Sequence, residues 1–135
     1  MTELVSTESI PKTLLSLAGV KVGDAMIGED LLDVVEHKDD NRPNEVFAQI
    51  SESRVGRCIR TADYTYSVYA PGINGGAQAA ADLYADDFLY DMGKDPWQLN
   101  NVVADPAYAD IKARLRQRLL DWIEKAEGTR PAITD

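Results

Sequence analysis

The side chains that most readily carry chemistry are scarce in this sequence. Its single histidine, His37, lies in the polar run 37–44 beside Asp39 and Asp40. Metal sites need several clustered His, Cys, Asp or Glu ligands, and a polar run that also contains a proline is typical of a solvated loop. Asp39 and Asp40 could hold a hard cation only weakly. We therefore predict a solvated loop here and no metal site in the chain.

A nucleophilic centre is equally hard to assemble. A serine or cysteine nucleophile needs a basic partner within hydrogen-bond reach, and His37 is the only imidazole available. The single cysteine, Cys58, occupies an alternating position of a predicted strand, where a small core residue is expected. It cannot form an internal disulfide. The sequence therefore predicts no catalytic residue.

Two further patterns have both a functional and a structural interpretation. The run 71–76 is rich in glycine but lacks the Lys-Ser/Thr pair that completes a phosphate-binding loop. Tyr64, Tyr66 and Tyr69 could stack on a sugar ring, although tyrosines on a strand more often pack in a core. We expect a surface loop in the first case and packing residues in the second.

The charge of the chain disfavours one class of partner. The formal net charge is -9 and the pI is near 4.5, so binding to nucleic acid is not expected. Lys112, Arg114, Arg116 and Arg118 are a local exception, but they alternate with apolar helix positions. We interpret them as a solvated helix face and not as a phosphate-binding stripe.

The first element expected is a short helix near the N-terminus. Ser9 is an N-cap type of residue, Pro11 suits a first turn, and an apolar run ends at Gly19. A helix of about two turns needs a larger surface to pack on. The run is too short to span a bilayer, and Glu3 and Glu8 precede it, so neither a signal peptide nor membrane insertion is expected. The compartment stays open, the cytoplasm included.

A small antiparallel sheet is expected in the middle of the chain. Apolar side chains alternate over 45–51, and strands at 57–61 and 64–69 flank a tight turn at Ala62-Asp63, which predicts a hairpin. A further strand at 88–92 ends where glycine and proline supply turn chemistry. Three to four antiparallel strands result.

The last element expected is a long helix. Asp105 can cap it, Pro106 suits its first position, and apolar residues recur at spacings of three and four: Tyr108, Ile111, Leu115, Leu119, Trp122 and Ala126. One face of this helix must be buried, most simply on the sheet. The predicted fold is α+β: a small antiparallel sheet of three to four strands packed against a long C-terminal helix, with a short N-terminal helix.

Three segments carry the motifs of a known family. Residues 9–20, SIPKTLLSLAGV, and 26–32 are similar to a D-x-x-P-T-L-L-x-L-A-G helix and a G-x-S-L-L turn. Residues 57–66, RCIRTADYTY, resemble R-x-x-R-T-x-x-x-K-Y, and 89–101, LYDMGKDPWQLNN, resemble L-Y-D-L-x-x-D-P-x-E-x-x-N. Together they resemble the C-terminal region of sulfatases, arylsulfatase-like proteins of the alkaline phosphatase superfamily. The departures from the motifs are Ser9, Lys12, Asp30, Thr65 and Gln98.

The resemblance implies a chemistry that this chain does not carry. In complete sulfatases a cysteine or serine in a C/S-x-P-S/A-R motif becomes formylglycine, whose hydrate attacks sulfur beside a calcium ion. Cys58 is followed by Ile59-Arg60 and does not match that motif. No catalytic or metal-ligating residue is therefore carried over, no cofactor is expected in this chain, and calcium is expected only in the full-length parent.

The resemblance also implies a role and a domain organisation. Residues 1–135 are expected to form one C-terminal subdomain, in which 1–44 belong to the edge of a missing N-terminal catalytic domain and 45–135 form the sheet and helix. The expected partner is that catalytic domain, and the expected function is non-catalytic packing on it. The candidates for the rim of its substrate pocket share one strand end: Glu52, Arg54 and Arg57.

Two alternatives stay open. The chain could be a stand-alone binding or self-assembly module, a homo-oligomer whose contact surface includes Leu14, Leu15 and Leu17 of the first helix. The parent could also be a phosphonate or phosphodiester hydrolase, which shares the superfamily scaffold. The sequence names neither the substrate of the parent nor the oligomeric state.

Overall fold

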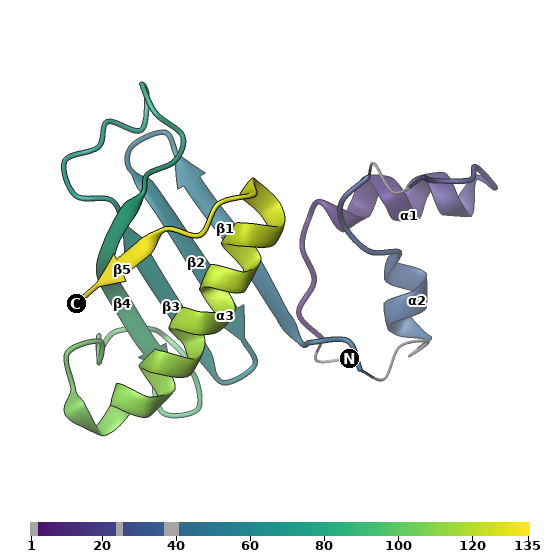
Figure 1. Ribbon diagram of the computed structural model, residues 1–135. Coiled ribbons are helices and arrows are strands. Elements are labelled where there is room, and N and C mark those ends of the chain that lie inside the picture. Colours follow the sequence, from purple (N-terminus) through teal and green to yellow (C-terminus); the bar gives the residue numbers. More distant parts are fainter. Residues whose placement is uncertain (1–2, 24–25, 37–40) are drawn as a thin grey trace. The chain divides into compact units, whose positions relative to one another are not determined.

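The computed structural model describes residues 3–23, 26–36 and 41–135 (Figure 1). The chain divides into two compact units, Met1–Val46 and Phe47–Asp135. We call them the N-terminal unit and the sheet unit. Each is held together by contacts of its own.

The N-terminal unit contains two short helices, α1 at Ser9–Leu17 and α2 at Leu31–Val35, so the predicted N-terminal helix is confirmed. Ser9 is not its N-cap. Glu8 holds that position, and Ser9 is buried in the first turn. The Ser9 hydroxyl accepts a hydrogen bond from the Glu29 N–H at 3.1 Å, and it thereby joins α1 to the segment that leads into α2.

Thr13 and Asp30 complete the link between the two helices. The Thr13 hydroxyl donates to the Ser9 carbonyl at 2.8 Å and accepts from the Leu31 N–H at 2.9 Å. Asp30 caps α2 by accepting from the Leu32 N–H at 3.0 Å. Polar side chains therefore stabilise this unit, while α1 leaves three large apolar side chains exposed: Ile10, Leu14 and Leu17.

The sheet has five strands: β1 at Glu45–Ser51, β2 at Val55–Thr61, β3 at Tyr64–Tyr69, β4 at Leu83–Asp91 and β5 at Ala132–Thr134. Their order in the sheet follows their order in the sequence. Strands β2, β3 and β4 pair antiparallel as predicted, whereas β5 pairs parallel to β4. The sheet is therefore mixed, and the predicted strand count is too low because β5 is too short to show an alternating pattern.

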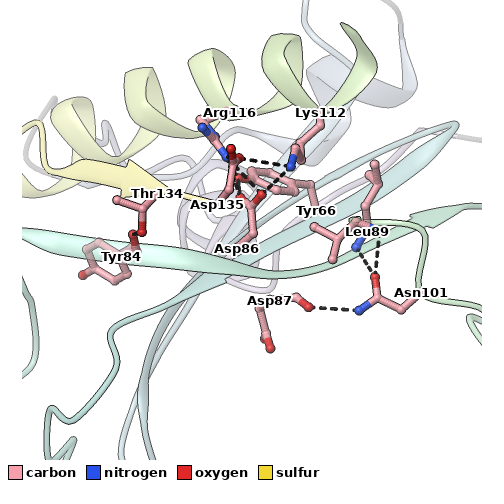
Figure 2. A network of polar contacts seen from close by, with 11 residues as sticks. Tyr66, Tyr84, Asp86, Asp87, Leu89, Asn101, Lys112, Arg116, Thr134 and Asp135 are labelled. Atoms are coloured by element: carbon pink, nitrogen blue, oxygen red, sulfur yellow. Dashed lines mark hydrogen bonds and ion pairs between the residues drawn. The ribbon is translucent and has the colours of Figure 1, made fainter. Parts of the chain in front are cut away.

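Strand β4 begins well before the predicted start at Phe88. The sequence disfavours a strand there because Asp86 and Asp87 are adjacent charges. A β-bulge opposite Ser67 and Val68 adds Asp87 to β4 as an extra residue. Asp86 is directed toward α3 and Asp87 away from it (Figure 2), and each has a cationic partner on its own side. Both carboxylates are thus compatible with a strand.

Helix α3 at Ala109–Glu127 follows a 3-10 turn at Pro106–Tyr108 and crosses one face of the sheet (Figure 1). Asp105 caps that turn, because its carboxylate accepts from the Ala107 N–H at 2.9 Å. Helix and sheet bury a common core: Val55, Ile59, Tyr66, Val68, Tyr84, Leu89, Leu115, Leu119 and Ile123. The predicted α+β fold with a long C-terminal helix is confirmed. No helix in the described part of the chain combines the length and the hydropathy needed to cross a membrane.

One buried ion pair runs from the sheet to the end of α3. The Arg57 side chain is 1% exposed, and its guanidinium donates to the Glu127 carboxylate at 2.5 and 3.0 Å. The guanidinium also donates to the carbonyl oxygens of Gly56 and Ala79, each at 2.8 Å, and lies over the Tyr84 ring. The last residue of α3 is thereby tied to β2 and to the loop before β4.

We predict that Glu127→Gln lowers the free energy of unfolding by about 3 kcal/mol, because it leaves the buried Arg57 charge without a counter-ion. Glu124→Gln is the matched control. Glu124 lies on the same helix and pairs with Arg130 at the surface, so its loss should cost less than about 1 kcal/mol. Urea unfolding followed by circular dichroism measures both values. Equal effects of the two substitutions would contradict the role of the buried pair.

Candidate functional site

The α3 side of the sheet carries a closed cluster of charges (Figure 2). Asp86, whose side chain is 5% exposed, contacts Lys112 at 2.8 Å and Arg116 at 3.0 Å. Both cations also contact Asp135, at 3.1 and 2.7 Å, and the Tyr66 hydroxyl donates to Asp86. Each charge in the cluster has an opposite partner, so the cluster holds β4 to α3 and offers no open charge.

These contacts correct the interpretation of the basic residues near the end of the chain. Lys112 and Arg116 face the sheet, and the hydrogen bond to Asp86 raises the pKa of Lys112. Arg114 and Arg118 are exposed. The predicted solvated helix face therefore does not describe Lys112 and Arg116, because both cations contact carboxylates on the sheet side of the helix.

The tyrosines of β3 differ in accessibility. Tyr66 is fully buried in the core, so its predicted packing role is confirmed and it has no free ring face for a sugar. Tyr69 is partly buried, and the Arg54 guanidinium lies 5.7 Å from its ring centre.

The face of the sheet opposite α3, which we call the open face, has a composition of its own. Ile59, Tyr66 and Leu89 pair across three strands and face α3, so their sequence neighbours point the other way. Within the described part of the sheet unit no helix covers that side (Figure 1). The open face includes Ile50, Cys58, Arg60, Thr65, Ser67, Tyr69, Asp87, Phe88 and Tyr90.

The turn between β1 and β2 carries two of the predicted rim residues beside the open face. Arg54, 45% exposed, pairs with Asp87, and Glu52 is exposed on the same turn. A Cβ atom on Gly75 would lie 2.8 Å from the Glu52 carbonyl oxygen, so only glycine lets the loop before β4 pack this closely. Glu52 and Arg54 thus stand at the surface on a supported turn.

Arg57, the third predicted rim residue, does not lie with them. Its side chain faces α3, where Glu127 neutralises it, while the Asp87 partner of Arg54 lies on the other face. In this chain only Glu52 and Arg54 of the three candidates are accessible.

Arg60 is the second cation on the open face, and sequence reasoning named it only as part of a motif. Its Nη1 donates to the Thr65 hydroxyl at 2.7 Å. Its Nε is buried and has no hydrogen-bond partner among the described residues. The aromatic rings of Phe88 and Tyr90 lie on the same face, with centres 5.0 Å apart. The alternation in β2 could have assigned Arg60 to the face opposite Ile59, but no local pattern indicates an unpartnered nitrogen.

Cys58 has the environment of a structural cysteine. It is partly buried and forms no disulfide. Burial raises the pKa of its thiol to about 11, an effect larger than the lowering by the nearby Arg60 charge. The thiolate that a nucleophilic attack requires is therefore scarce at neutral pH.

The side chains present do not fit the calcium and formylglycine chemistry that the motifs imply for a complete sulfatase. No three His, Cys, Asp or Glu side chains come together to hold a metal ion in residues 3–23, 26–36 and 41–135. The loop residues singled out from the sequence, His37, Asp39 and Asp40, lie outside the described residues. We derive no catalytic step through either group.

Comparison with known proteins decides the family. The family described as N-sulphoglucosamine sulphohydrolase, C-terminal, matches residues 1–125. The chain belongs to this family. The resemblance carried by the three motifs is thereby confirmed, and the chain is a sulfatase C-terminal domain.

Curated relatives of this sulfatase C-terminal domain are much longer. A Delta 4,5-hexuronate-2-O-sulfatase of Bacteroides thetaiotaomicron is 32% identical over 121 residues, and an ulvan-active sulfatase of Formosa agariphila is 25% identical over 122 residues. Each alignment covers 85% of this chain, but only 23% and 21% of the respective relative. The domain thus spans about a fifth to a quarter of the length of these two relatives.

Solved structures contain the same fold. A 2-O GAG sulfatase matches 86% of this chain with a TM-score of 0.64 at 27% identity, and the match covers 24% of that chain. A protein solved in complex with its substrate D-glucosamine-2-N,6-O-disulfate matches 91% of this chain with a TM-score of 0.73, covering 24% of that chain. At 22% identity the second likeness concerns the fold alone.

The third sulfatase motif has a structural role in this domain. Asn101, the last residue of that motif, accepts from the Leu89 N–H and donates to the Asp87 carbonyl, each at 3.0 Å (Figure 2). Its side chain therefore fixes the turn that follows β4. The same turn leaves two large apolar side chains largely exposed to solvent: Trp97 at 81% and Leu99 at 79%.

We predict that Cys58 of the folded domain reacts with iodoacetamide at pH 8 at least about a hundredfold more slowly than in the urea-unfolded chain. A thiol pKa near 11 leaves far less thiolate at this pH than the ordinary value does. Labelling followed by mass spectrometry gives both rates. Rapid labelling of the folded domain would identify Cys58 as a reactive cysteine.

Proposed function

We propose that this sulfatase C-terminal domain is the non-catalytic subdomain of a sulfuric ester hydrolase and packs on its catalytic domain. The observation that carries the proposal is the match of residues 1–125 to the family's C-terminal region, combined with coverage of only 21–23% of two sulfatase relatives. The remaining length of such a parent would supply the formylglycine, the calcium site and the substrate pocket.

The chemistry of the described residues supports a non-catalytic role. The thiol of Cys58 is largely protonated at neutral pH, and the carboxylates of Asp86 and Asp135 neutralise Lys112 and Arg116. Groups engaged in this way hold elements together. Catalysis would instead need a poised acid, base or nucleophile.

The two faces of the sheet support packing on another domain. The α3 face is filled by the core, whereas the open face combines aromatic rings, an aliphatic side chain and an arginine. A sheet face of this composition that no helix in the described part of the sheet unit covers is suited to a second layer. The catalytic domain is the partner we propose for it.

The turn between β1 and β2 supports the finer proposal that the domain shapes the rim of the substrate pocket. The Arg54–Asp87 pair is half-exposed, so a sulfate or carboxylate group of a substrate could replace Asp87 as the partner of Arg54. Glu52 could accept hydrogen bonds from sugar hydroxyls. Arg57 enters this proposal only as support for the sheet, because its guanidinium is buried. A purely structural role for the turn is the competing account.

The alternatives make different predictions. The relatives reported above are named as sulfatases, which favours a sulfuric ester hydrolase over a phosphonate or phosphodiester hydrolase as parent. A stand-alone module would instead cover its apolar surface with a second copy.

We predict that the purified chain shows no turnover of 4-nitrophenyl sulfate in the presence of calcium and sediments as a monomer of 14.9 kDa. The physical reason is that the reacting groups belong to the proposed parent. Turnover that survives repurification would overturn the non-catalytic role. A stable dimer would favour the stand-alone module.

A chimera tests the rim. In it, this chain replaces the matched 121-residue segment of the Bacteroides hexuronate sulfatase. We predict that Arg54→Ala raises KM roughly tenfold with little change in kcat, because a charge-assisted hydrogen bond to an anionic substrate is lost. Arg130→Ala is the matched control, since Arg130, which follows α3, also pairs at the surface, with Asp121 of that helix. The rim proposal fails if Arg54→Ala and Glu52→Ala both leave the kinetics toward every substrate unchanged.

A further inference from the structure

Arg60 differs from the other arginines of its strand and turn in how its charge is satisfied. Arg54 pairs with Asp87, and Arg57 pairs with Glu127. Arg60 has a neutral hydroxyl as its partner at Nη1, and its buried Nε donates to nothing in the described part of the chain. No carboxylate of the described residues lies within ion-pair distance of it. Its side chain therefore carries an unmet hydrogen-bonding and charge requirement.

An unmet donor at a buried site is unfavourable. Removing a guanidinium N–H from water without a partner costs on the order of 1–3 kcal/mol, and native structures rarely keep such groups unless something unseen satisfies them. The acceptor must approach from the open face, because the other side of β2 is filled by Ile59 and the core.

Arg60 shares its face of the sheet with aromatic and aliphatic side chains. Phe88 and Tyr90 are packed together at 5.0 Å on the same face, and Ile50 leaves 42% of its surface exposed. Arginine and tyrosine are among the residue types most enriched at the positions that dominate binding energy. Because Asp87 is already neutralised by Arg54, the unbalanced charge contributed by Arg60 is positive.

We infer that Arg60 is the polar anchor by which the open face docks on the catalytic domain of its sulfatase, and that the anchor's partner there is a carboxylate. This inference rests on the proposed function and adds a partner group to it. The relatives supply more than three-quarters of their length from outside the matched region, so the catalytic domain is the occupant available. A second copy suits the face poorly, because a two-fold contact brings another Arg60 and no unpaired Asp87.

The proposed anchor predicts that substituting Arg60 affects the stability of the isolated domain and the stability of the enzyme differently. In the isolated chain, Arg60→Met removes an unsatisfied donor and keeps the length of the side chain, so Tm should stay the same or rise. In the chimera with the hexuronate sulfatase, the same substitution leaves a buried carboxylate unpaired. It should speed irreversible inactivation at about 45 °C at least tenfold.

Arg114→Met is the matched control, because Arg114 is exposed on α3 and its loss removes the same charge. It should leave both measurements at the unsubstituted values. Arg60→Lys keeps the charge without the Nε donor and should recover only part of the lost lifetime.

Each outcome has one meaning. Equal inactivation of the Arg60→Met and unsubstituted chimeras would overturn the anchor while leaving the proposed function in place. A large fall in Tm of the isolated Arg60→Met chain would also overturn it, since Arg60 would then act within the domain. An inactive unsubstituted chimera, beside an active hexuronate sulfatase, would count against the proposed function itself.

Discussion

The sheet unit depends on the neutralisation of a guanidinium inside its core. Arg57 stands on the α3 face of β2, between apolar neighbours, with 1% of its side chain exposed. A charge in that position is tolerated only if it is paired and fully hydrogen-bonded. Glu127 supplies the counter-charge from the last turn of α3, and the Ala79 carbonyl takes a further N–H. The position of the helix end and the path of the loop before β4 follow from this requirement.

The same logic shapes β4. Two adjacent aspartates would disfavour a strand, but the bulge at Asp87 sends it to the open face while Asp86 stays on the α3 face. Lys112 and Arg116 then bind Asp86 from the helix, and Arg54 binds Asp87 from the turn. One irregularity in the ladder thereby gives each face its own ion pair, and charge neutrality allows a strand where the adjacent aspartates disfavour one.

What the sequence can predict depends on how far apart along the chain the interacting residues lie. The hairpin of β2 and β3 and the cap at Asp105 depend on residues close in sequence, and their patterns predict them correctly. Arg57 and Glu127 are 70 residues apart, and Asp86 and Arg116 are 30 apart; no local pattern reports such pairs. The burial of Arg57, the early start of β4 and the parallel β5 were therefore out of reach. Motif resemblance identified the family, but a motif does not say that Arg57 and Arg60 point to opposite faces.

That opposition explains why the domain is suited to being one part of a larger protein. A single helix can cover only one face of a sheet, and here it covers the face on which the charged residues are internally satisfied. The other face keeps aromatic side chains and an arginine whose Nε has no acceptor within the described chain. Apolar area provides affinity without direction, whereas a fixed guanidinium accepts a partner in few geometries. An interface with both would be strong and would hold one register, which is what the proposed packing on a catalytic domain requires.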